Sequence, residues 1–496
     1  MAIAKVCGIE TEYGVHVVSG GEMSPTTASS LLINAYVAQL ERRIGWDFED
    51  ESPGRDARGF AREGSMPPDI ETHLVNAVLT NGARYYVDHA HPEYSTPECS
   101  DPLQLVCHDK AGELILARSM EAARRLLPPG EEIVVYKNNS DGKGNSYGCH
   151  ENYLVDRSVP FARLVQRLTP HFVSRQIFAG AGKIGQENSE TSSPVHFQLS
   201  QRADFFEEEV GLETTLKRPI INTRDEPHAD PQKYRSLHVI VGDANLAEVA
   251  SFLKVGTTAL VLAMIEDEFE GDRDLTLSNP VASIRAISHD PDLGVAVELA
   301  SGERLTAIEL QWELLGLARK YAVERGLEVL GGSEVGTMVL DRWEQVLAGL
   351  ESDPPSLASQ LDWVAKRRLV EAYRDRHGLE WSDHRLAALD LQYHDVRPHK
   401  SLFSRLQMEH LVDPAEVERA VSEPPATTRA YFRGRCLARY APSIVAANWD
   451  SVVFDVGQDP LRRVPMMEPL RGTARHVETL LNECESPAEL VERLGS

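Results

Sequence analysis

The sequence predicts an α+β fold built on an antiparallel-rich sheet. Short β-like runs and long amphipathic helices occur along its 496 residues, but they do not alternate regularly as the elements of a parallel sheet would. Strands are expected at residues 2–18 (two runs), 83–90, 131–139, 236–242, 281–287 and 294–299, the last two forming a hairpin. A turn-rich segment, residues 91–102, is expected after the strand 83–90. Helices are expected at residues 25–43, 103–126, 244–265, 306–325 and 355–377.

Two breaks interrupt this pattern. Residues 44–73 contain eight acidic side chains and three prolines and follow neither the helical nor the strand period. An irregular stretch of this length inside a compact domain is usually functional or mobile, so we expect a mobile loop insertion there. The proline-marked joint at residues 422–428 predicts a boundary between a catalytic unit of residues 1–424 and a small C-terminal unit of residues 425–496.

Composition excludes several classes of protein. The formal net charge of −25 repels nucleic acid phosphates and anionic membrane surfaces, so neither is an expected partner. No apolar run reaches the roughly 18 residues of a membrane helix, and the first residues lack the pattern of a secretory signal peptide. The six cysteines have no zinc-ligand spacing, which indicates reduced thiols. We therefore expect a cytoplasmic protein.

Cations are nevertheless gathered in two places. The two clusters are Lys217, Arg218, Arg224, Lys233 and Arg235, and Lys366, Arg367, Arg368, Arg374 and Arg376. Either cluster could line a local basic groove. A solvated helix or loop face is the plainer alternative for each cluster.

The first candidate site is the pair Glu10 and Glu12. Residues two apart on a strand point to the same face, so both carboxylates share one face of the predicted N-terminal strand. Carboxylates so placed repel each other unless a cation or a proton lies between them. Mg²⁺ binds such oxygens together with phosphate oxygens. The alternative is an edge strand that exposes two solvated glutamates.

The second candidate site repeats this logic near the end of the expected strand 83–90. Tyr86 and Asp88 share a face, and ionisable residues follow them at once. These followers are His89, His91, Glu93 and Glu98. An aspartate among metal-bound carboxylates could serve as nucleophile or general base. The His89–His91 pair alone is a weak zinc signal, and one buried and one surface histidine is the plainer alternative.

Further polar segments lie downstream. His150 and Asn152 share a strand face and could touch metal or phosphate, with an ordinary hairpin as the alternative. Residues 180–185 match GxGxxG, but no helix is expected after them, so we interpret them as a flexible loop. The arginines of 222–245 and of 429–433 suit phosphate or carboxylate oxygens, and Trp449 could stack on a base. Structural ion pairs are the alternative for these arginines.

Six motifs along the chain are more specific together than any one of them: GIETEYG, NGARYYVDHAHPEYSTPE, YKNNSDGKGNSYGCHENY, LKRPIINTRDEPHAD, LHVIVGDANLAE and TTRAYFRG. Together they resemble the family of Pup ligase and Pup deamidase/depupylase, where Pup is the prokaryotic ubiquitin-like protein. The resemblance covers essentially the whole chain. It implies a glutamine-synthetase-like carboxylate–amine ligase fold with a small C-terminal domain, and it implies ATP and Mg²⁺ held in a cradle of antiparallel strands.

The resemblance also implies roles for individual residues. It implies that Glu10, Tyr86 and Glu93 bind the metal, that Arg84, Thr96 and Trp449 contact the nucleotide, and that Asp88 is catalytic. From the chemistry of the neighbouring motifs we add Glu12 and His150 as metal ligands, Arg224, His238 and Arg433 as cofactor contacts, and Arg218 and Arg235 as substrate contacts.

Two features favour the deamidase/depupylase branch. DHAHPEYS is one residue shorter than the corresponding ligase segment as the family is known, and the insertion at 44–73 resembles the mobile loop of that branch. The resemblance implies an amidohydrolase that needs ATP (or ADP plus phosphate) and Mg²⁺ without consuming nucleotide stoichiometrically. Its substrates would be the C-terminal glutamine of Pup and the Pup–lysine isopeptide bond of pupylated proteins, with a functional link to the bacterial proteasome.

Three alternatives stay open at this point. A Pup–protein ligase would share the fold and the nucleotide site, and it would phosphorylate a glutamate carboxylate before a lysine attacks. A non-catalytic, nucleotide-gated adaptor for Pup would not need Glu10, Asp88 and Glu93. A glutamate–cysteine-type ligase would act on small molecules and would not need the long acidic insertion.

Overall fold

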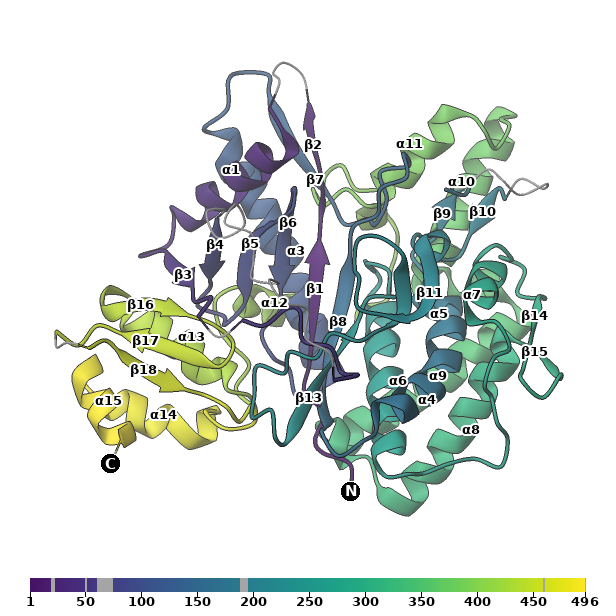
Figure 1. The fold of residues 1–496 in the computed structure, drawn as a ribbon. Coiled ribbons are helices and arrows are strands. Elements are labelled where there is room, and N and C mark those ends of the chain that lie inside the picture. Colours follow the sequence, from purple (N-terminus) through teal and green to yellow (C-terminus); the bar gives the residue numbers. More distant parts are fainter. Residues whose placement is uncertain (19–22, 50, 60–74, 188–194, 458–459, 496) are drawn as a thin grey trace.

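A ten-stranded sheet runs through the molecule (Figure 1). The computed structural model describes residues 1–18, 23–49, 51–59, 75–187, 195–457 and 460–495. In order across the sheet, the strands are β13 (Tyr234–Val239), β8 (Cys149–Asp156), β1 (Cys7–Glu12), β6 (His91–Ser95), β5 (Arg84–Asp88), β4 (Asn76–Val78), β3 (Ile44–Trp46), β16 (Ile444–Ala447), β17 (Ser451–Phe454) and β18 (Arg462–Pro465).

The pairing of these strands is antiparallel, with one exception. β3 and β16 run parallel, with Gly45 beside Ala446. Four two-stranded sheets accompany the main one: β2 (Gly14–Val18) with β7 (Glu132–Tyr136), β9 (Lys183–Ile184) with β10 (Phe197–Gln198), β11 (Phe206–Gly211) with β12 (Arg218–Asn222), and β14 (Ala296–Glu298) with β15 (Arg304–Thr306). The predicted α+β class with an antiparallel-rich sheet is therefore confirmed.

Helices cover one face of this sheet and form a second layer beside it (Figure 1). They are α1 (Pro25–Val37), α3 (Pro102–Arg124), α4 (Phe161–Ser174), α5 (Gln176–Ala179), α6 (Glu248–Glu266), α7 (Pro280–Ser288), α8 (Ala307–Arg325), α9 (Ser333–Ser352), α10 (Asp362–His377), α11 (His384–Tyr393), α12 (Pro414–Ala420), α13 (Ala430–Arg439), α14 (Ala474–Glu483) and α15 (Pro487–Gly495). Because α1 and α3 pack on β1, β5 and β6, the opposite face of these strands is left for polar side chains.

Local sequence signals explain several helix boundaries. Asp101 caps α3 by accepting a hydrogen bond from Gln104 N at 2.8 Å, and Pro102 occupies the first turn. Thr306 and Glu309 form a capping box at the start of α8. α6 is apolar and long enough to pass as a membrane span by composition, but its apolar stretch is wholly buried inside the protein. A buried core helix explains that composition.

Three sequence predictions are corrected here. Residues 281–287 belong to helix α7 rather than to a strand, because Asn279 caps this segment and Ile284 and Ile287 recur at helical spacing. The segment 91–95, expected as a turn, is strand β6 between β1 and β5. The irregular insertion begins with strand β3, residues 47–49 and 51–59 have no regular structure, and 60–73 lie outside the described residues.

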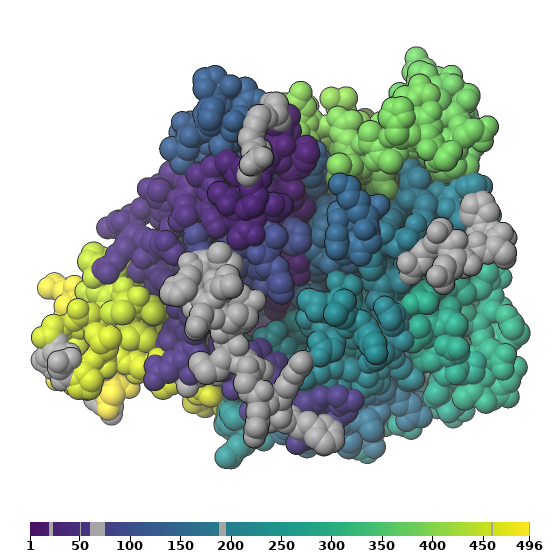
Figure 2. Space-filling model, turned by 45° about the horizontal axis from the view of Figure 1, so that its top comes forward, coloured from purple at the N-terminus to yellow at the C-terminus, as the bar shows by residue number. Residues whose placement is uncertain are grey.

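The C-terminal part of the chain has its own apolar core. Phe432, Leu437, Phe454 and Leu481 cluster there, and they pack with Trp46 of β3. Figure 1 and Figure 2 both place this part, in yellow, at one flank of the molecule. Because β16 pairs with β3, the main sheet continues into this region without interruption. The proposed division near residue 424 stays a prediction.

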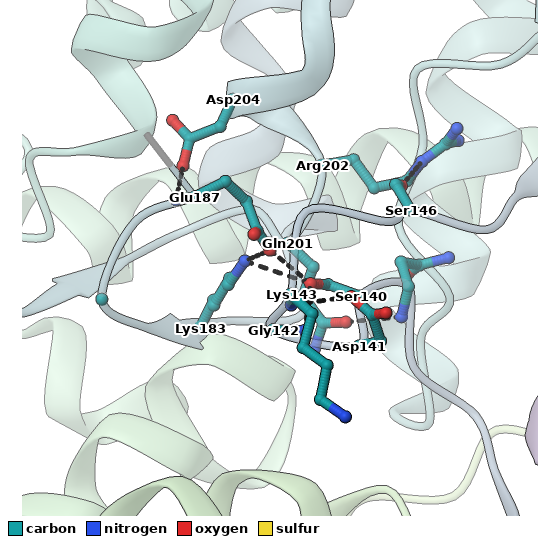
Figure 3. A network of polar contacts seen from close by, with 12 residues as sticks. Ser140, Asp141, Gly142, Lys143, Ser146, Lys183, Glu187, Gln201, Arg202 and Asp204 are labelled. Atoms are coloured by element: carbon teal, nitrogen blue, oxygen red, sulfur yellow. Dashed lines mark hydrogen bonds and ion pairs between the residues drawn. The ribbon is translucent and has the colours of Figure 1, made fainter. Parts of the chain in front are cut away.

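In the glycine-rich segment 180–185, residues 180–183 are buried and Lys183–Ile184 form strand β9, which corrects the expectation of a flexible loop. Lys183 forms an ion pair with Glu187, and Ser140 donates a hydrogen bond to the same carboxylate (Figure 3). Glu187 N donates to Asp204 Oδ2 at 3.0 Å. Since its lysine is paired within the chain, this GxGxxG match does not form a phosphate-binding loop.

The contribution of Asp204 to this network can be tested by measuring stability at different pH values. Burial opposes its ionisation, but hydrogen bonds from His289 and Gln198 hold the pKa of Asp204 at about 2, below its ordinary 3.8. The stabilisation, about 2 kcal/mol, is present above pH 4 and is lost as pH falls towards 2. We expect Asp204→Asn to lower the free energy of unfolding at pH 7, with a smaller difference from wild type at acid pH.

The measurement is urea unfolding of both proteins at pH 7 and at pH 3.5, followed by circular dichroism. Asp272→Asn, at an exposed position, is the control and should change neither value. A deficit of Asp204→Asn that is equally large at both pH values would contradict the role given to the charge.

Candidate active site

Five adjacent strands present one polar face. In β1 and β5, buried apolar residues alternate with less buried polar ones, so Glu10, Glu12, Tyr86 and Asp88 point away from the core. The register brings these side chains together across strands. Glu93 of β6 lies opposite both Glu12 and Tyr86. The structure thus brings together the acidic residues that the sequence placed on separate strands.

Glu12, Asp88 and Glu93 form the tightest acidic group. One carboxylate oxygen from each of the three residues lies within 4.8 Å of the other two. Glu93 is 2% exposed, and its burial together with the charges of Asp88, Glu10 and Glu12 raises its pKa well above the ordinary value. The hydroxyl group of Tyr86 donates a hydrogen bond to Glu93 Oε1. A hard divalent cation would relieve this repulsion, so the donor set fits Mg²⁺.

Glu10 lies beside this group, not in it. Asn152 Nδ2 donates to Glu10 Oε1, and His150 Nδ1 lies 3.8 Å from Glu10 Oε2. Burial opposes ionisation of Glu10, but the contact with His150 and the charge of Arg224 lower its pKa. Glu10 is therefore held as a carboxylate at the edge of the acidic group. His150 pairs with Glu10 and also lines a cavity beside the acidic group.

Two neighbouring cavities open on this face. The larger, about 520 Å³, is lined by the acidic group, His91, His150, Arg202 and Arg218; we call it the acidic cavity. The smaller, about 180 Å³, is lined by Gly8, Thr96, His238, Arg429 and Trp449; we call it the aromatic cavity. Their shared lining residues are Glu10, Glu51, Arg84, Tyr86, Arg224 and His238. A ligand in the aromatic cavity could thus reach the acidic group.

Cationic and aromatic side chains stack beside the aromatic cavity. The guanidinium of Arg84 lies 4.1 Å from the ring centre of Trp46 and 3.9 Å from that of Tyr86. The rings of Trp46 and Trp449 meet edge to face at 5.2 Å. Thr96 Oγ1 accepts a hydrogen bond from Ile9 N at 3.0 Å. A flat base and charged phosphates match this combination of rings and cations.

His238 presents an unpaired nitrogen to the cavities. Its Nδ1 lies 3.1 Å from Asn152 Oδ1, and within the part of the chain described its buried Nε2 has no partner. Burial lowers the pKa of His238 to about 3, so the ring is neutral at physiological pH. Because an amide oxygen can only accept, Nδ1 carries the proton and Nε2 offers a lone pair.

Two predicted ligand contacts lie away from both cavities. Arg235 is 7% exposed and pairs with Asp225 at 3.4 Å. Arg433 is fully buried and binds Glu98 and the carbonyls of Gly82 and Trp449. Both side chains form ion pairs inside the protein, which is the alternative to ligand binding that the sequence left open. By contrast, Arg84, Thr96, Arg218, Arg224, His238 and Trp449 line one cavity or both.

Two members of the second basic cluster are engaged inside the protein. Lys366 is fully buried between Asp390 and His394, and Arg367 pairs with Asp292 and Glu371. The charges of these residues are thus satisfied inside α10 and its neighbours.

Sequence reasoning missed two residues of the site. Arg202 lines the acidic cavity and donates to Ser146 Oγ at 3.3 Å (Figure 3). Glu51, from the insertion, lines both cavities and accepts from Trp46 Nε1 at 2.5 Å. Arg202 follows a two-residue strand and Glu51 lies in an irregular segment, so neither has a periodic signal that could have marked it.

A polar strand cradle beside an aromatic, cationic cavity fits the binding of a nucleotide. The chain belongs to the Pup-ligase protein family, whose model matches residues 5–453. It is 56% identical to a depupylase of Acidothermus cellulolyticus and 50% identical to a Pup deamidase/depupylase of Mycolicibacterium smegmatis, each alignment covering 99% of both chains. The resemblance drawn from the motifs is therefore confirmed.

Solved structures of Pup ligase share the fold. The complex between Pup and its ligase PafA gives a TM-score of 0.81 at 35% identity and covers 97% of this chain and 91% of that chain. The structure of PafA with ADP gives a TM-score of 0.74 at 37% identity and covers 89% of this chain and 96% of that chain. Similarity in sequence is thus higher to the depupylases than to these ligases.

Gly148 gives a test of the acidic cavity. A Cβ at this position would overlap His150 Nε2 and lie 2.8 Å from Glu12 Oε1. We expect Gly148→Ala to displace Glu12 and to weaken divalent cation binding by about 10- to 100-fold. Mn²⁺ binding followed by electron paramagnetic resonance measures this. Gly45→Ala is the control, since nothing lies within 4 Å of a Cβ there. Equal Mn²⁺ affinity of both variants would refute the steric argument.

Proposed function

We propose that the chain is a nucleotide- and Mg²⁺-dependent amidohydrolase acting on Pup. It deamidates the C-terminal glutamine of Pup to glutamate, and it cleaves the isopeptide bond between Pup and a lysine of a pupylated protein. The observation that carries this proposal is the position of Asp88 within 4.8 Å of Glu12 and Glu93 at an open cavity. The two depupylases, more similar in sequence than the ligases, support the hydrolytic direction.

Asp88 carries the reaction in this proposal. Although burial opposes ionisation, the hydrogen bond and charge of His89 lower the pKa of Asp88. His89 Nδ1 lies 3.1 Å from Asp88 Oδ1, in a tight turn where the φ of His89 is 51°. An ionised carboxylate can attack the amide carbonyl directly or take a proton from an attacking water. In the direct route the carbonyl carbon forms an anhydride with Asp88 as the C–N bond breaks, and a water then hydrolyses the anhydride to glutamate and free Asp88. In the other route the water attacks the carbonyl at once. Both routes consume one water overall, and the departing ammonia or lysine amine takes up a proton.

Glu12 and Glu93, with Glu10 and Tyr86 beside them, are the residues that would hold Mg²⁺. Arg84, Thr96, Arg224, His238 and Trp449 would hold ATP, or ADP plus phosphate. Mg²⁺ held there would supply positive charge near the carbonyl oxygen, where negative charge develops, and the nucleotide phosphates would help to hold the cation. Arg202 and Arg218 line the same cavity as Glu12 and would orient the substrate's carbonyl and carboxylate groups by hydrogen bonding.

Pup and pupylated proteins are the proposed partners, with the bacterial proteasome as the functional link and the cytoplasm as the location. The Pup–protein ligase is the second candidate, because the same cradle occurs in PafA. A ligase consumes ATP for each bond formed. Release of ammonia from Pup ending in glutamine, without net loss of ATP, therefore separates the two activities.

Asp88→Asn tests the catalytic assignment. We expect at least about a thousandfold loss of deamidation rate, since the amide can neither attack nor accept a proton. Nucleotide affinity should stay within twofold, because Asp88 does not line the aromatic cavity. Ammonia release and calorimetric ADP titration are the measurements. Full turnover by the variant would remove Asp88 from its role.

Arg218→Glu tests whether the arginines that line the acidic cavity bind Pup. The family resemblance implies that Pup is acidic and largely disordered. We therefore expect the affinity of the variant for Pup to fall about tenfold or more at low salt, with a smaller effect at high salt because salt screens the charges. Fluorescence anisotropy of labelled Pup measures this. Arg368→Glu, at an exposed position of the second basic cluster, is the control and should bind like wild type. Equal losses for both variants would point to net charge alone.

A further inference from the structure

Glu98 lies at the border between the main sheet and the C-terminal part of the chain. It follows Thr96 by two residues and lines the aromatic cavity. Its side chain is 13% exposed and pairs with two arginines, Arg429 Nε at 2.7 Å and Arg433 Nη2. Thr428 Oγ1 donates to its carbonyl at 2.7 Å. One carboxylate therefore fastens the segment after β6 to the start of α13.

The two arginines extend this connection to other walls of the cavity. Arg433 Nη1 donates to the carbonyl of Trp449 at 2.9 Å, and its guanidinium lies 5.1 Å from the Trp449 ring centre. Arg429 Nη1 donates to the carbonyls of His228 and Met466 at 2.6 and 2.7 Å. Trp449 and His228 line the aromatic cavity. The position of these walls thus depends on where Glu98 holds the two guanidinium groups.

The charge balance of this group explains why Glu98 stays ionised. Burial opposes ionisation, but Arg433 and Arg429 lower the pKa of Glu98 to about 2. Both carboxylate oxygens accept hydrogen bonds from the arginines. Without the carboxylate, two buried guanidinium groups would lose their counter-charge, and such groups shift to find new partners.

We propose that Glu98 is a positioning residue for nucleotide binding, which acts through Arg433 on Trp449. The inference rests on the proposed function, because it takes the aromatic cavity as the nucleotide site. Glu98 is not a direct ligand in this account, since its oxygens are already used by Arg429 and Arg433. Trp449 is the residue that meets the base, and Glu98 sets the edge-to-face distance of 5.2 Å between Trp449 and Trp46.

Calorimetric titration of the full-length protein with Mg²⁺–ADP at 25 °C tests this inference. Glu98→Gln keeps the shape of the side chain but removes the charge, and we expect the dissociation constant of ADP to rise about tenfold. The deamidation rate at saturating nucleotide should stay within twofold of wild type, because the acidic group is untouched. Glu478→Gln is the matched control: Glu478 accepts from Tyr431 at 3.0 Å outside the cavity.

A double-mutant cycle separates positioning from general loosening of the structure. If Glu98 acts through Trp449, the losses of ADP affinity in Glu98→Gln and Trp449→Ala will not add in the double variant. Should Glu98→Gln not fold, Arg433→Lys carries the same test, since lysine cannot bind carboxylate and carbonyls with a planar fork. Wild-type ADP affinity in these variants, or fully additive losses, overturns the inference. A wild-type protein that binds no ADP overturns the proposed function itself.

Discussion

Repulsion among carboxylates on one sheet face is the constraint on which the site depends. Glu12, Asp88 and Glu93 bring ligand oxygens within 4.8 Å of one another, and the backbone register fixes their approach because Glu12 and Glu93 are direct cross-strand partners. Like charges placed so closely need a cation or a proton between them. The sheet tolerates this arrangement because apolar side chains on its other face, such as Tyr85 and Val87, are buried against helices.

The sequence was sufficient for features that depend on one segment. The two-residue period placed Glu10 with Glu12 and Tyr86 with Asp88, and the structure agrees. Features that depend on contacts between several segments could not be predicted from the period of one segment. Strand β6 contains Pro92 and was expected as a turn, although its partners β1 and β5 satisfy its backbone on both sides. Helix α7 was mistaken for a strand because its short apolar run fits either period.

The presence of arginine in the sequence was the least informative signal for predicting which side chains line the site. Arg218 and Arg224 line the acidic cavity, whereas Arg235 and Arg433, equally plausible in sequence, are buried in internal ion pairs. The difference lies in the partner, which comes from a distant part of the chain: Glu98 is 335 residues from Arg433. An arginine reveals what it binds only when its acceptors are known in space. Family resemblance supplied the nucleotide-contacting roles expected of Arg84 and Thr96, which the residues alone did not indicate.

Ligases and amidohydrolases can share one cradle because both reactions take place at the same side-chain carbonyl carbon and place negative charge on its oxygens. Activation of a glutamate carboxylate and cleavage of a glutamine amide both place negative charge on oxygens of the side-chain carboxyl group, where fixed cations stabilise it. The direction then depends on which nucleophile reaches that carbon. In the proposed hydrolase, Asp88 and the open acidic cavity provide a carboxylate or a water, so the cradle stabilises charge without transferring phosphate. Changes around Asp88, more than changes in the cradle, are therefore expected to separate the two activities within the family.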